Sequence, residues 1–233
     1  MHSKRYRKLR EQLTDVSPQS VEAAVELLRK MKSAKFNETV DLVIRLGLDL
    51  KKLQQPVRGS AVLPHGTGRQ VRVLVFAQGE QVARAQAAGA DYVGGQDLIE
   101  KVRGGWMEFD AVVATPDMMK NVASLGKILG PRGLMPSPKT GTVTFEVERV
   151  VEELKKGRVD FKMDKDGNIH LPVGKISFDP SHLSDNIRSA LAAVAGAKPP
   201  SAKGVFIKTA YLSLTMSPSV PLQMSEVAPQ TQA

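Results

Sequence analysis

Strands and helices alternate through the middle of this sequence, and that pattern restricts the fold more than any other feature. The segment VRVLVFA at residues 71–77 is mostly apolar, as expected for a strand buried on both faces. Helix-forming residues follow at 79–90, and FDAVVATP at 109–116 reads as another strand that ends at a proline. Alternating strands and helices indicate a mainly parallel sheet. We therefore predict a Rossmann-like, three-layer α/β domain.

The same signals predict the remaining elements of this middle segment. Asp117 stands where a side chain would cap the helix DMMKNVASL. The other expected elements are a short strand at 91–95, a helix at 96–105, a strand at 141–145 and a helix at 146–157.

The two flanks have a different pattern. Ser17–Pro18 is expected to open a helix that runs to about Lys32, and FNETVDLVIRLG (36–47) alternates like a half-buried strand. The remaining expected elements are a strand at 59–64, a hairpin at 159–178 around Asp166–Gly167, a helix at 180–195 and a strand at 204–216. Neither flank can cover a sheet alone, so we predict one α+β domain formed by both termini.

We place the outer domain at residues 1–66 and 158–233, with the α/β domain inserted at 67–157. Gly66, Gly68 and Gly157 lie beside basic residues at the two junctions and are the predicted hinge. The polar tail at 223–233 lacks periodicity and is expected to be disordered.

Positive charge is concentrated in the outer segments. Lys and Arg number 13 against 7 Asp and Glu in residues 1–66, and 8 against 6 in residues 158–233. The middle segment has 12 against 11, so it contributes little to the total of +9. A basic excess of this kind favours nucleic acid over a charge that serves solubility alone.

The composition also limits the compartment. The chain has no cysteine, which excludes disulfides and thiolate metal ligands and fits a reducing cytoplasm. No apolar run approaches the roughly 20 residues that cross a bilayer, so no membrane partner is expected. The basic N-terminus lacks the apolar stretch of a secretory signal, and an organelle transit peptide is the weaker reading.

The stretch GKILGPRGLMPSPKTG at residues 126–141 is dense in glycine and proline and has no acidic residue. Proline fixes φ and glycine permits tight bends, so the segment is expected to be a shaped, cationic loop. It presents Lys127, Arg132 and Lys139 but no evident nucleophile or general base. The loop is suited to holding a polyanion.

No catalytic or cofactor site is evident. Gly66-Thr67-Gly68 precedes a strand, whereas phosphate-binding loops follow one, so a hinge is the better interpretation. The four histidines, His2, His65, His170 and His182, show no metal-ligand spacing, and structural or surface roles are expected. Asp110 and Asp117 flank a strand but have no visible partner base. We predict no cofactor, no metal and no enzyme activity.

Two stretches of the outer domain suit RNA. The segment 33–39 displays an ammonium, a ring and a hydroxyl, and the end of the last long strand displays hydroxyls and a thioether. Hydroxyls can pair with ribose 2′-hydroxyls, and apolar side chains can lie against the sugar. The alternative is that Ser and Thr favour strands and turns and that Phe36 belongs to the core.

Several blocks, in collinear order from about Lys4 to Leu222, closely resemble the ribosomal protein L1 family of the mobile large-subunit stalk, in its bacterial form. The most specific is the glycine- and proline-rich stretch, and the others are VRGSAVLPHGTGRQVRV, AGADYVGG, FDAVVATPDMM and AKFNETVD. The resemblance implies a two-domain protein in which both termini form one domain.

The resemblance also implies a function. Members bind a folded stem-junction of large-subunit ribosomal RNA, help move and release exit-site tRNA, and in many bacteria repress translation of their own operon mRNA. It therefore implies a ribosome-associated cytoplasmic protein, and we expect a monomer away from the ribosome.

Position by position, the RNA contacts implied are Lys35, Phe36, Thr39, Thr209, Ser213, Thr215, Met216 and Ser217. Thr209 stands where the family often has serine. Ser217 replaces its usual glycine, and the β-carbon would limit positive φ and close backbone approach to ribose, so a local adjustment is expected there. Lys127, Arg132 and Lys139 are candidate RNA or tRNA contacts, or parts of a structural element near tRNA.

Two alternatives compete with this reading. One is an α/β enzyme that binds a nucleotide or phosphorylated ligand in the inserted domain. The other is a free translational repressor that does not reside on the ribosome.

Overall fold

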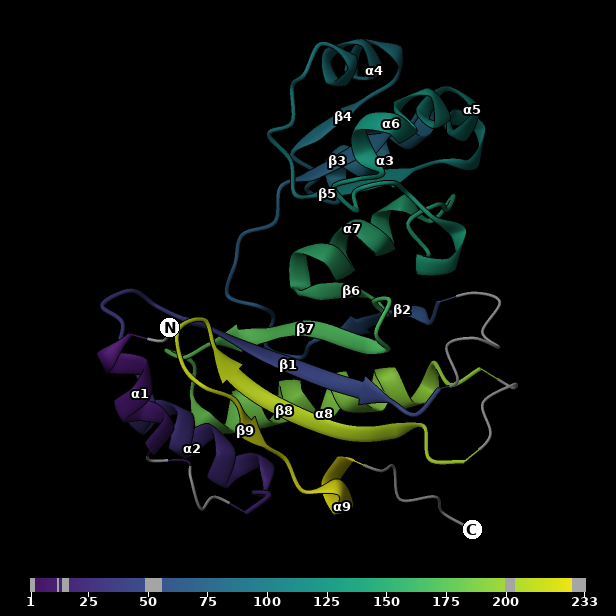
Figure 1. The fold of residues 1–233 in the computed structure, drawn as a ribbon. Helices are drawn as coiled ribbons and strands as arrows, with labels where there is room; N and C mark the ends of the chain where they lie inside the picture. Colours follow the sequence, from purple (N-terminus) through teal and green to yellow (C-terminus); the bar gives the residue numbers. More distant parts are fainter. Residues whose placement is uncertain (1–2, 12, 14–16, 49–55, 200–203, 228–233) are drawn as a thin grey trace. The chain divides into compact units, whose positions relative to one another are not determined.

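The computed structural model describes residues 3–11, 13, 17–48, 56–199 and 204–227. The chain divides into two compact units, residues 1–68 with 159–233, here called the terminal unit, and residues 69–158, the inserted unit (Figure 1). The junctions at 68/69 and 158/159 fall two residues and one residue later than the sequence placed them. Each unit has its own apolar core.

The terminal unit contains two sheets. The larger has the strand order β7-β1-β8-β9 with antiparallel neighbours, and the smaller pairs β2 with β6. Its elements are α1 (Lys4–Glu11), α2 (Val21–Met31), β1 (Thr39–Leu46), β2 (Arg58–Val62), β6 (Arg158–Lys162), β7 (Asn168–Lys175), α8 (Pro180–Gly196), β8 (Ile207–Leu214), β9 (Val220–Pro221) and α9 (Met224–Val227).

Helices α2 and α8 cover one face of the larger sheet. The predicted apolar stripe of α2 is buried, and it packs in one cluster with the inward residues Val40, Leu42 and Ile44 of β1. Their neighbours along β1 point to the opposite face, because side chains alternate along a strand. Figure 1 shows β1 and β8 passing in front of α8, and no helix of this unit lies in front of these strands. One face of the sheet is therefore open.

Two sequence predictions for this unit need correction. Helix α2 begins after Ser20, whose side chain accepts a hydrogen bond from the Ala23 amide at 3.3 Å, and not at Ser17–Pro18. The preceding Gln19 instead forms a parallel bridge with Leu222. The predicted tail also contains a short helix, α9, whose Met224 packs on the core; residues 228–233 lie outside the described residues.

The hairpin predicted at 159–178 has the expected turn but the wrong strand pairing. The Asp164 carboxylate accepts hydrogen bonds from the amides of Asp166 and Asn168 at 2.9 and 2.7 Å, and Gly167 has φ +85°. However, β6 pairs with β2, whereas β7 pairs with β1. The turn directs two successive strands into different sheets.

The inserted unit has a parallel sheet of order β4-β3-β5 with helices on both faces. Leu74 and Phe76 of β3 pack on one side, and Val73 and Val75 on the other, so the strand is buried on both faces as predicted. Its elements are β3 (Val73–Phe76), α3 (Glu80–Ala87), β4 (Tyr92–Gly94), α4 (Gln96–Arg103), β5 (Ala111–Ala114), the 3₁₀ turns η1 (Pro116–Met118), η2 (Ala123–Leu125) and η3 (Pro138–Thr140), and the helices α5 (Met119–Val122), α6 (Gly126–Leu129) and α7 (Val147–Lys156).

Three details of the inserted unit differ from the sequence predictions. Asp117 lies inside η1, whose N-cap position is Thr115, so it is not the predicted cap. The strand expected at 141–145 is reduced to one parallel bridge between Ala114 and Val143. Residues 126–129 at the start of the glycine- and proline-rich stretch form the helical turn α6.

No helix within the described ranges is long and apolar enough to cross a membrane. Most charged and polar residues of the two units face outward and the apolar clusters are internal; the buried polar or charged residues among those described are Glu38, Thr115, Thr142, Ser184 and Asn186.

If the two units unfold separately, Leu28→Ala will destabilise the terminal unit alone. Leu28 is fully buried, so its truncation should cost about 2–5 kcal/mol of unfolding free energy. Trp106, the chain's single tryptophan, packs on Tyr92 in the inserted unit and reports that unit by fluorescence. In Leu28→Ala, the urea midpoint measured by Trp106 fluorescence should stay unchanged, while the midpoint of the terminal unit, measured by far-UV circular dichroism, should fall. The matched variant Leu125→Ala should move the Trp106 transition; equal shifts of both signals in Leu28→Ala would contradict separate unfolding.

Candidate nucleic-acid interface

The two RNA-contact segments predicted from sequence meet at the end of the larger sheet. The Thr39 amide donates to Thr215 Oγ1 at 3.2 Å, and the Thr215 amide donates to the Thr39 carbonyl oxygen at 3.2 Å. These residues lie 176 positions apart, and the pairing of β1 with β8 brings them together. Lys35, Phe36 and the turn at 215–217 therefore belong to one surface.

Glu38 holds the two segments in place. It is 1% exposed, and its Oε1 accepts a hydrogen bond from the Met216 amide at 3.0 Å. Its own carbonyl accepts from the Ile176 amide at 3.0 Å, which adds the end of β7 to the same junction. Sequence reasoning did not select Glu38 as a functional residue. The local sequence contains one indication of its role: Glu38 is an acid within a segment, 33–39, that otherwise suits the binding of an anion.

The surface displays apolar groups in water. Phe36 is 51% exposed and Met216 is 42% exposed, and Lys35 is exposed beside them. The alternative that Phe36 belongs to the core is therefore wrong. Thr39 Oγ1 accepts from Lys175 Nζ at 2.7 Å, so a second ammonium is held at this site. Two cations, two hydroxyls and two uncovered apolar side chains are a suitable set for a sugar–phosphate backbone.

Ser217 fits the turn without a glycine's conformation. No described residue other than glycine has a positive φ, so Ser217 needs none. Its Oγ accepts from the Leu214 amide at 3.0 Å and donates to the Pro218 carbonyl at 3.0 Å. The local adjustment expected at this position takes the form of a turn that the Ser217 hydroxyl itself closes.

Thr209 and Ser213 lie farther along β8 on the open face. They stand opposite Arg45 and Asp41 of β1. Burial raises the pKa of Asp41, and Lys175 and His170 oppose that rise through their charge. A hollow of about 420 Å³ is lined by Thr209, and the open face thus continues from the surface at Thr215.

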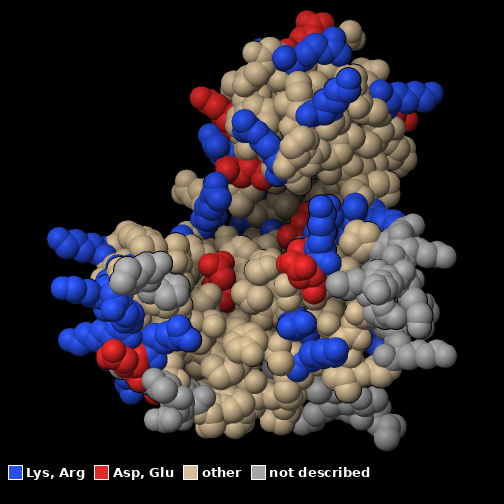
Figure 2. All heavy atoms as spheres, in the orientation of Figure 1, with Lys and Arg blue, Asp and Glu red and all other residues tan. Residues whose placement is uncertain are grey.

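Basic residues are also grouped on α1. Five of its eight residues, in KRYRKLRE, are Lys or Arg. Figure 2 shows these side chains projecting from the part of the terminal unit that carries α1. They add to the positive charge of this unit.

The glycine- and proline-rich loop belongs to the inserted unit. Lys127 projects from α6, Arg132 from the loop and Lys139 from η3, and all three side chains are exposed. Leu134 and Met135 pack on the core, and the Ser137 amide donates to Thr142 Oγ1 at 2.8 Å. The loop is shaped, as predicted, with its cations turned outward.

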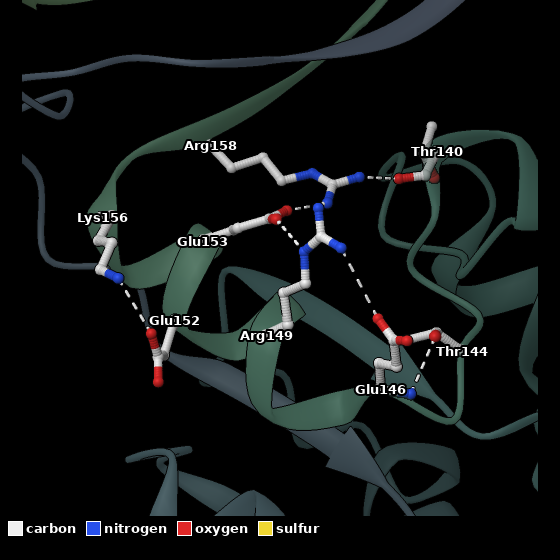
Figure 3. Close-up of polar contacts among 8 residues, drawn as sticks. All are labelled: Thr140, Thr144, Glu146, Arg149, Glu152, Glu153, Lys156 and Arg158. Atoms are coloured by element: carbon white, nitrogen blue, oxygen red, sulfur yellow. Dashed lines mark hydrogen bonds and ion pairs between the residues drawn. The ribbon is translucent and has the colours of Figure 1, made fainter.

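The glycines of the two connections have conformations that other residues resist. Gly66, Gly68 and Gly157 have φ of +68°, +70° and +111°. A β-carbon at Gly68 would lie 2.9 Å from the Phe178 ring. Gly157 ends α7, and the next residue, Arg158, has a nearly buried side chain that donates to Glu153 Oε2 at 2.7 Å and to the Thr140 carbonyl (Figure 3).

Asp110, one of the two acids considered as catalytic candidates, has structural partners. Asp110 lies at the start of β5, where Arg72 and Arg69 bind its carboxylate at 3.0 and 2.8 Å. The hydrogen bond from Arg72 lowers the pKa of Asp110, so it is a poor general base.

The described histidines are likewise surface or structural residues. The His65 and His182 rings stack at 3.9 Å, and His170 Nε2 lies 3.5 Å from Asp164 Oδ2; His2 lies outside the described residues. Within the described part of the chain, no group of three or more His, Cys, Asp or Glu side chains could hold a metal ion.

Comparisons with known proteins match nearly the whole chain. The model of the ribosomal protein L1p/L10e family matches residues 28–218. Two proteins from Thermus thermophilus, each named large ribosomal subunit protein uL1, are 51% identical over 220 residues, which cover 94% of this chain and 96% of each relative.

The Asp110 carboxylate should stabilise the inserted unit in a pH-dependent way. Since its folded-state pKa is depressed, its contribution is present above the ordinary aspartate pKa near 3.8 and is lost as pH falls through the folded-state value. Asp110→Asn should thus be less stable than wild type at pH 7, and the difference should narrow below about pH 3.8. The measurement is urea unfolding of both proteins at each pH, followed by Trp106 fluorescence. Asp117→Asn, at an exposed acid, is the control, and a gap that stayed constant with pH would contradict this role.

Proposed function

Because the chain belongs to the ribosomal protein L1p/L10e family, we propose that it is a structural constituent of the large ribosomal subunit whose terminal unit binds ribosomal RNA. The family consists of structural ribosomal proteins, and the chain is not an enzyme. The alternative of an α/β enzyme that binds a nucleotide in the inserted unit is therefore discarded.

The observation that carries this proposal is the uncovered surface at the junction of β1 and β8. Exposing Phe36 and Met216 at this junction costs apolar burial in the free protein, and a ligand that covers them recovers it. A folded RNA supplies ribose faces for the apolar side chains and 2′-hydroxyls for Thr39 and Thr215. DNA lacks the 2′-hydroxyl, so this chemistry favours RNA.

The ligand proposed is the stem-junction of the mobile stalk in large-subunit ribosomal RNA. The hydrogen bonds of Glu38 with Met216 and of Thr39 with Thr215 fix the backbone that carries the proposed RNA contacts before the RNA binds. Preorganisation of this kind lowers the entropy lost on binding and favours one RNA shape over others. A similar shape in the operon mRNA would bind the same surface, which provides a route to repression of translation.

The two connections suggest how the stalk moves. The Gly66 carbonyl accepts a hydrogen bond from Asn186 of the terminal unit, and Gly68 lies where a β-carbon would meet the Phe178 ring, whereas Arg69 is bound to Asp110 of the inserted unit. In the second connection Arg158 is held by Glu153, and the next residue packs on the core of the terminal unit. We place the pivots at the 68/69 and 158/159 peptides.

The inserted unit would then present its loop cations to exit-site tRNA. Lys127, Arg132 and Lys139 carry positive charge on a shaped loop, and tRNA offers phosphates that such cations can neutralise. In this proposal the protein works in the cytoplasm on the ribosome and is a monomer when free. A free repressor that never resides on the ribosome would not cosediment with large subunits after a high-salt wash, which separates the two cases.

Removing either uncovered apolar side chain should weaken RNA binding. Phe36→Ala and Met216→Ala are each expected to lose roughly 1–3 kcal/mol of binding free energy, about 5- to 150-fold in Kd. The measurement is equilibrium binding to a stalk-junction fragment of large-subunit ribosomal RNA at fixed salt. Both residues are exposed, so the variants should fold normally.

Phe145→Ala is the matched control, because Phe145 is 57% exposed but lies in the inserted unit. It should bind the fragment like wild type. Wild-type affinity in both Phe36→Ala and Met216→Ala would move the RNA site elsewhere.

A further inference from the structure

The open face of the larger sheet has a hollow to which Thr209 is the one RNA contact discussed so far that contributes. The hollow is open to solvent, has a volume of about 420 Å³ and is lined by Val43, Arg45, Asn168, Lys208, Thr209 and Tyr211. The strand register explains this grouping. Tyr211 pairs with Val43, and Arg45 pairs with both Thr209 and Asn168, so three adjacent strands build one floor. Its volume falls within the range of small-ligand sites, about 300–1,000 Å³.

Tyr211 is the largest apolar group in this hollow. It is 36% exposed at a strand position whose neighbours Ala210 and Leu212 are buried. A ring that stands on a sheet with one accessible side is a platform on which a flat ligand can stack. Proteins that bind single-stranded nucleic acid stack bases on aromatic side chains of this kind.

The charge around Tyr211 is positive. Arg45 and Lys208 are exposed, and within the described part of the chain neither forms an ion pair with a carboxylate. The carboxylate of Asp164 lies nearby, but it accepts hydrogen bonds from the backbone and side chain of Asn168, and these lower its pKa. Figure 2 shows Lys and Arg side chains over the part of the sheet where β1 ends and β8 begins. Two free cations beside an aromatic platform fit a ligand with both a ring and an anion.

The hollow is continuous with the surface at Thr215. Tyr211, Ser213 and Thr215 follow one another along the same side of β8. At about 3.3 Å per residue, Tyr211 lies roughly 13 Å from Thr215. An RNA seated on Phe36 and Met216 can thus reach the hollow with a neighbouring nucleotide.

We propose that the hollow binds one unpaired nucleotide of the RNA. The base stacks on Tyr211, the phosphate lies between Arg45 and Lys208, and the Thr209 hydroxyl pairs with the ribose. A base that is paired inside an RNA helix cannot stack on the Tyr211 ring. The hollow therefore selects an RNA with an unpaired nucleotide about 13 Å from the part that contacts Thr215. This inference rests on the proposed RNA-binding function and adds a specificity determinant to it.

The test measures binding of Tyr211 variants to the stalk-junction fragment. Tyr211→Ala should weaken binding roughly 5- to 100-fold, and Tyr211→Phe, which keeps the ring, should stay within about twofold of wild type. Tyr211→Leu keeps an apolar strand-compatible side chain without the ring and should resemble Tyr211→Ala. Circular dichroism checks that each variant folds. Arg45→Gln and Lys208→Gln should each make the dependence of log Kd on log salt concentration shallower, by about one released counterion.

A second series replaces each unpaired nucleotide of the fragment in turn by an abasic site. These RNAs and the Tyr211 variants form a double-mutant cycle. One abasic RNA should bind wild type and Tyr211→Ala equally, because it lacks the base that stacks on Tyr211. Full affinity in Tyr211→Ala, or a loss that no abasic site suppresses, would overturn the proposal.

The outcomes separate this proposal from the function on which it rests. Loss of binding in Phe36→Ala and Met216→Ala with unchanged Tyr211 variants rejects the nucleotide hollow alone. A wild-type protein with no preference for the stalk junction rejects both.

Discussion

The contact between the buried Glu38 carboxylate and the Met216 amide is the interaction on which the terminal unit's surface depends. It joins residues 178 positions apart, and the exchange of hydrogen bonds between Thr39 and Thr215 lies directly beside it. A carboxylate removed from water is costly unless it is hydrogen-bonded; Glu38 Oε1 has this bond, whereas Oε2 is buried with no hydrogen-bond partner among the described residues, so losing the Met216 contact would leave the whole carboxylate unpaired. With the ends fixed, Phe36 and Met216 can remain uncovered without the segment collapsing onto the core.

The second constraint is the way in which the chain leaves and re-enters this unit. Each connection is held on one side by packing or hydrogen bonds and on the other side by an arginine bound to a carboxylate. Asn186, which is fully buried, holds the first connection through the Gly66 carbonyl and the His65 amide. Arg158 holds the second through Glu153 and the Thr140 carbonyl, and so connects the end of the glycine- and proline-rich loop to the junction. These contacts are the reason for the proposed pivots, one peptide in each connection.

Sequence reasoning succeeded where burial repeats along the chain. The stripe of α2, the doubly buried β3 and the alternation of β1 follow from local periodicity, and the structure confirms them. It failed where the structure depends on contacts between residues that are distant in the sequence. Asp166–Gly167 predicted the turn correctly, but turn chemistry cannot reveal that β6 pairs with β2.

The same limit applies to the candidate site. The exposed Phe36 and Met216 were selected through resemblance to a family, and residue chemistry alone left Phe36 undecided between surface and core. Glu38 was missed because an acid between two polar residues reads locally as a solvated charge. The hollow around Tyr211 was also missed, since its lining comes from three strands whose register no local pattern specifies. Resemblance to known proteins identifies a family, whereas the sheet register identifies which side chains share a surface.

The central claim is that both chain ends together form one surface that fits a structured RNA. The most direct test compares equilibrium binding of the full-length protein to the stalk junction and to an unrelated RNA duplex of equal length, in moderate salt. We expect the junction to bind at least about tenfold more tightly, with a shallower salt dependence than binding through phosphates alone would give. Equal affinity for the two RNAs would contradict the account.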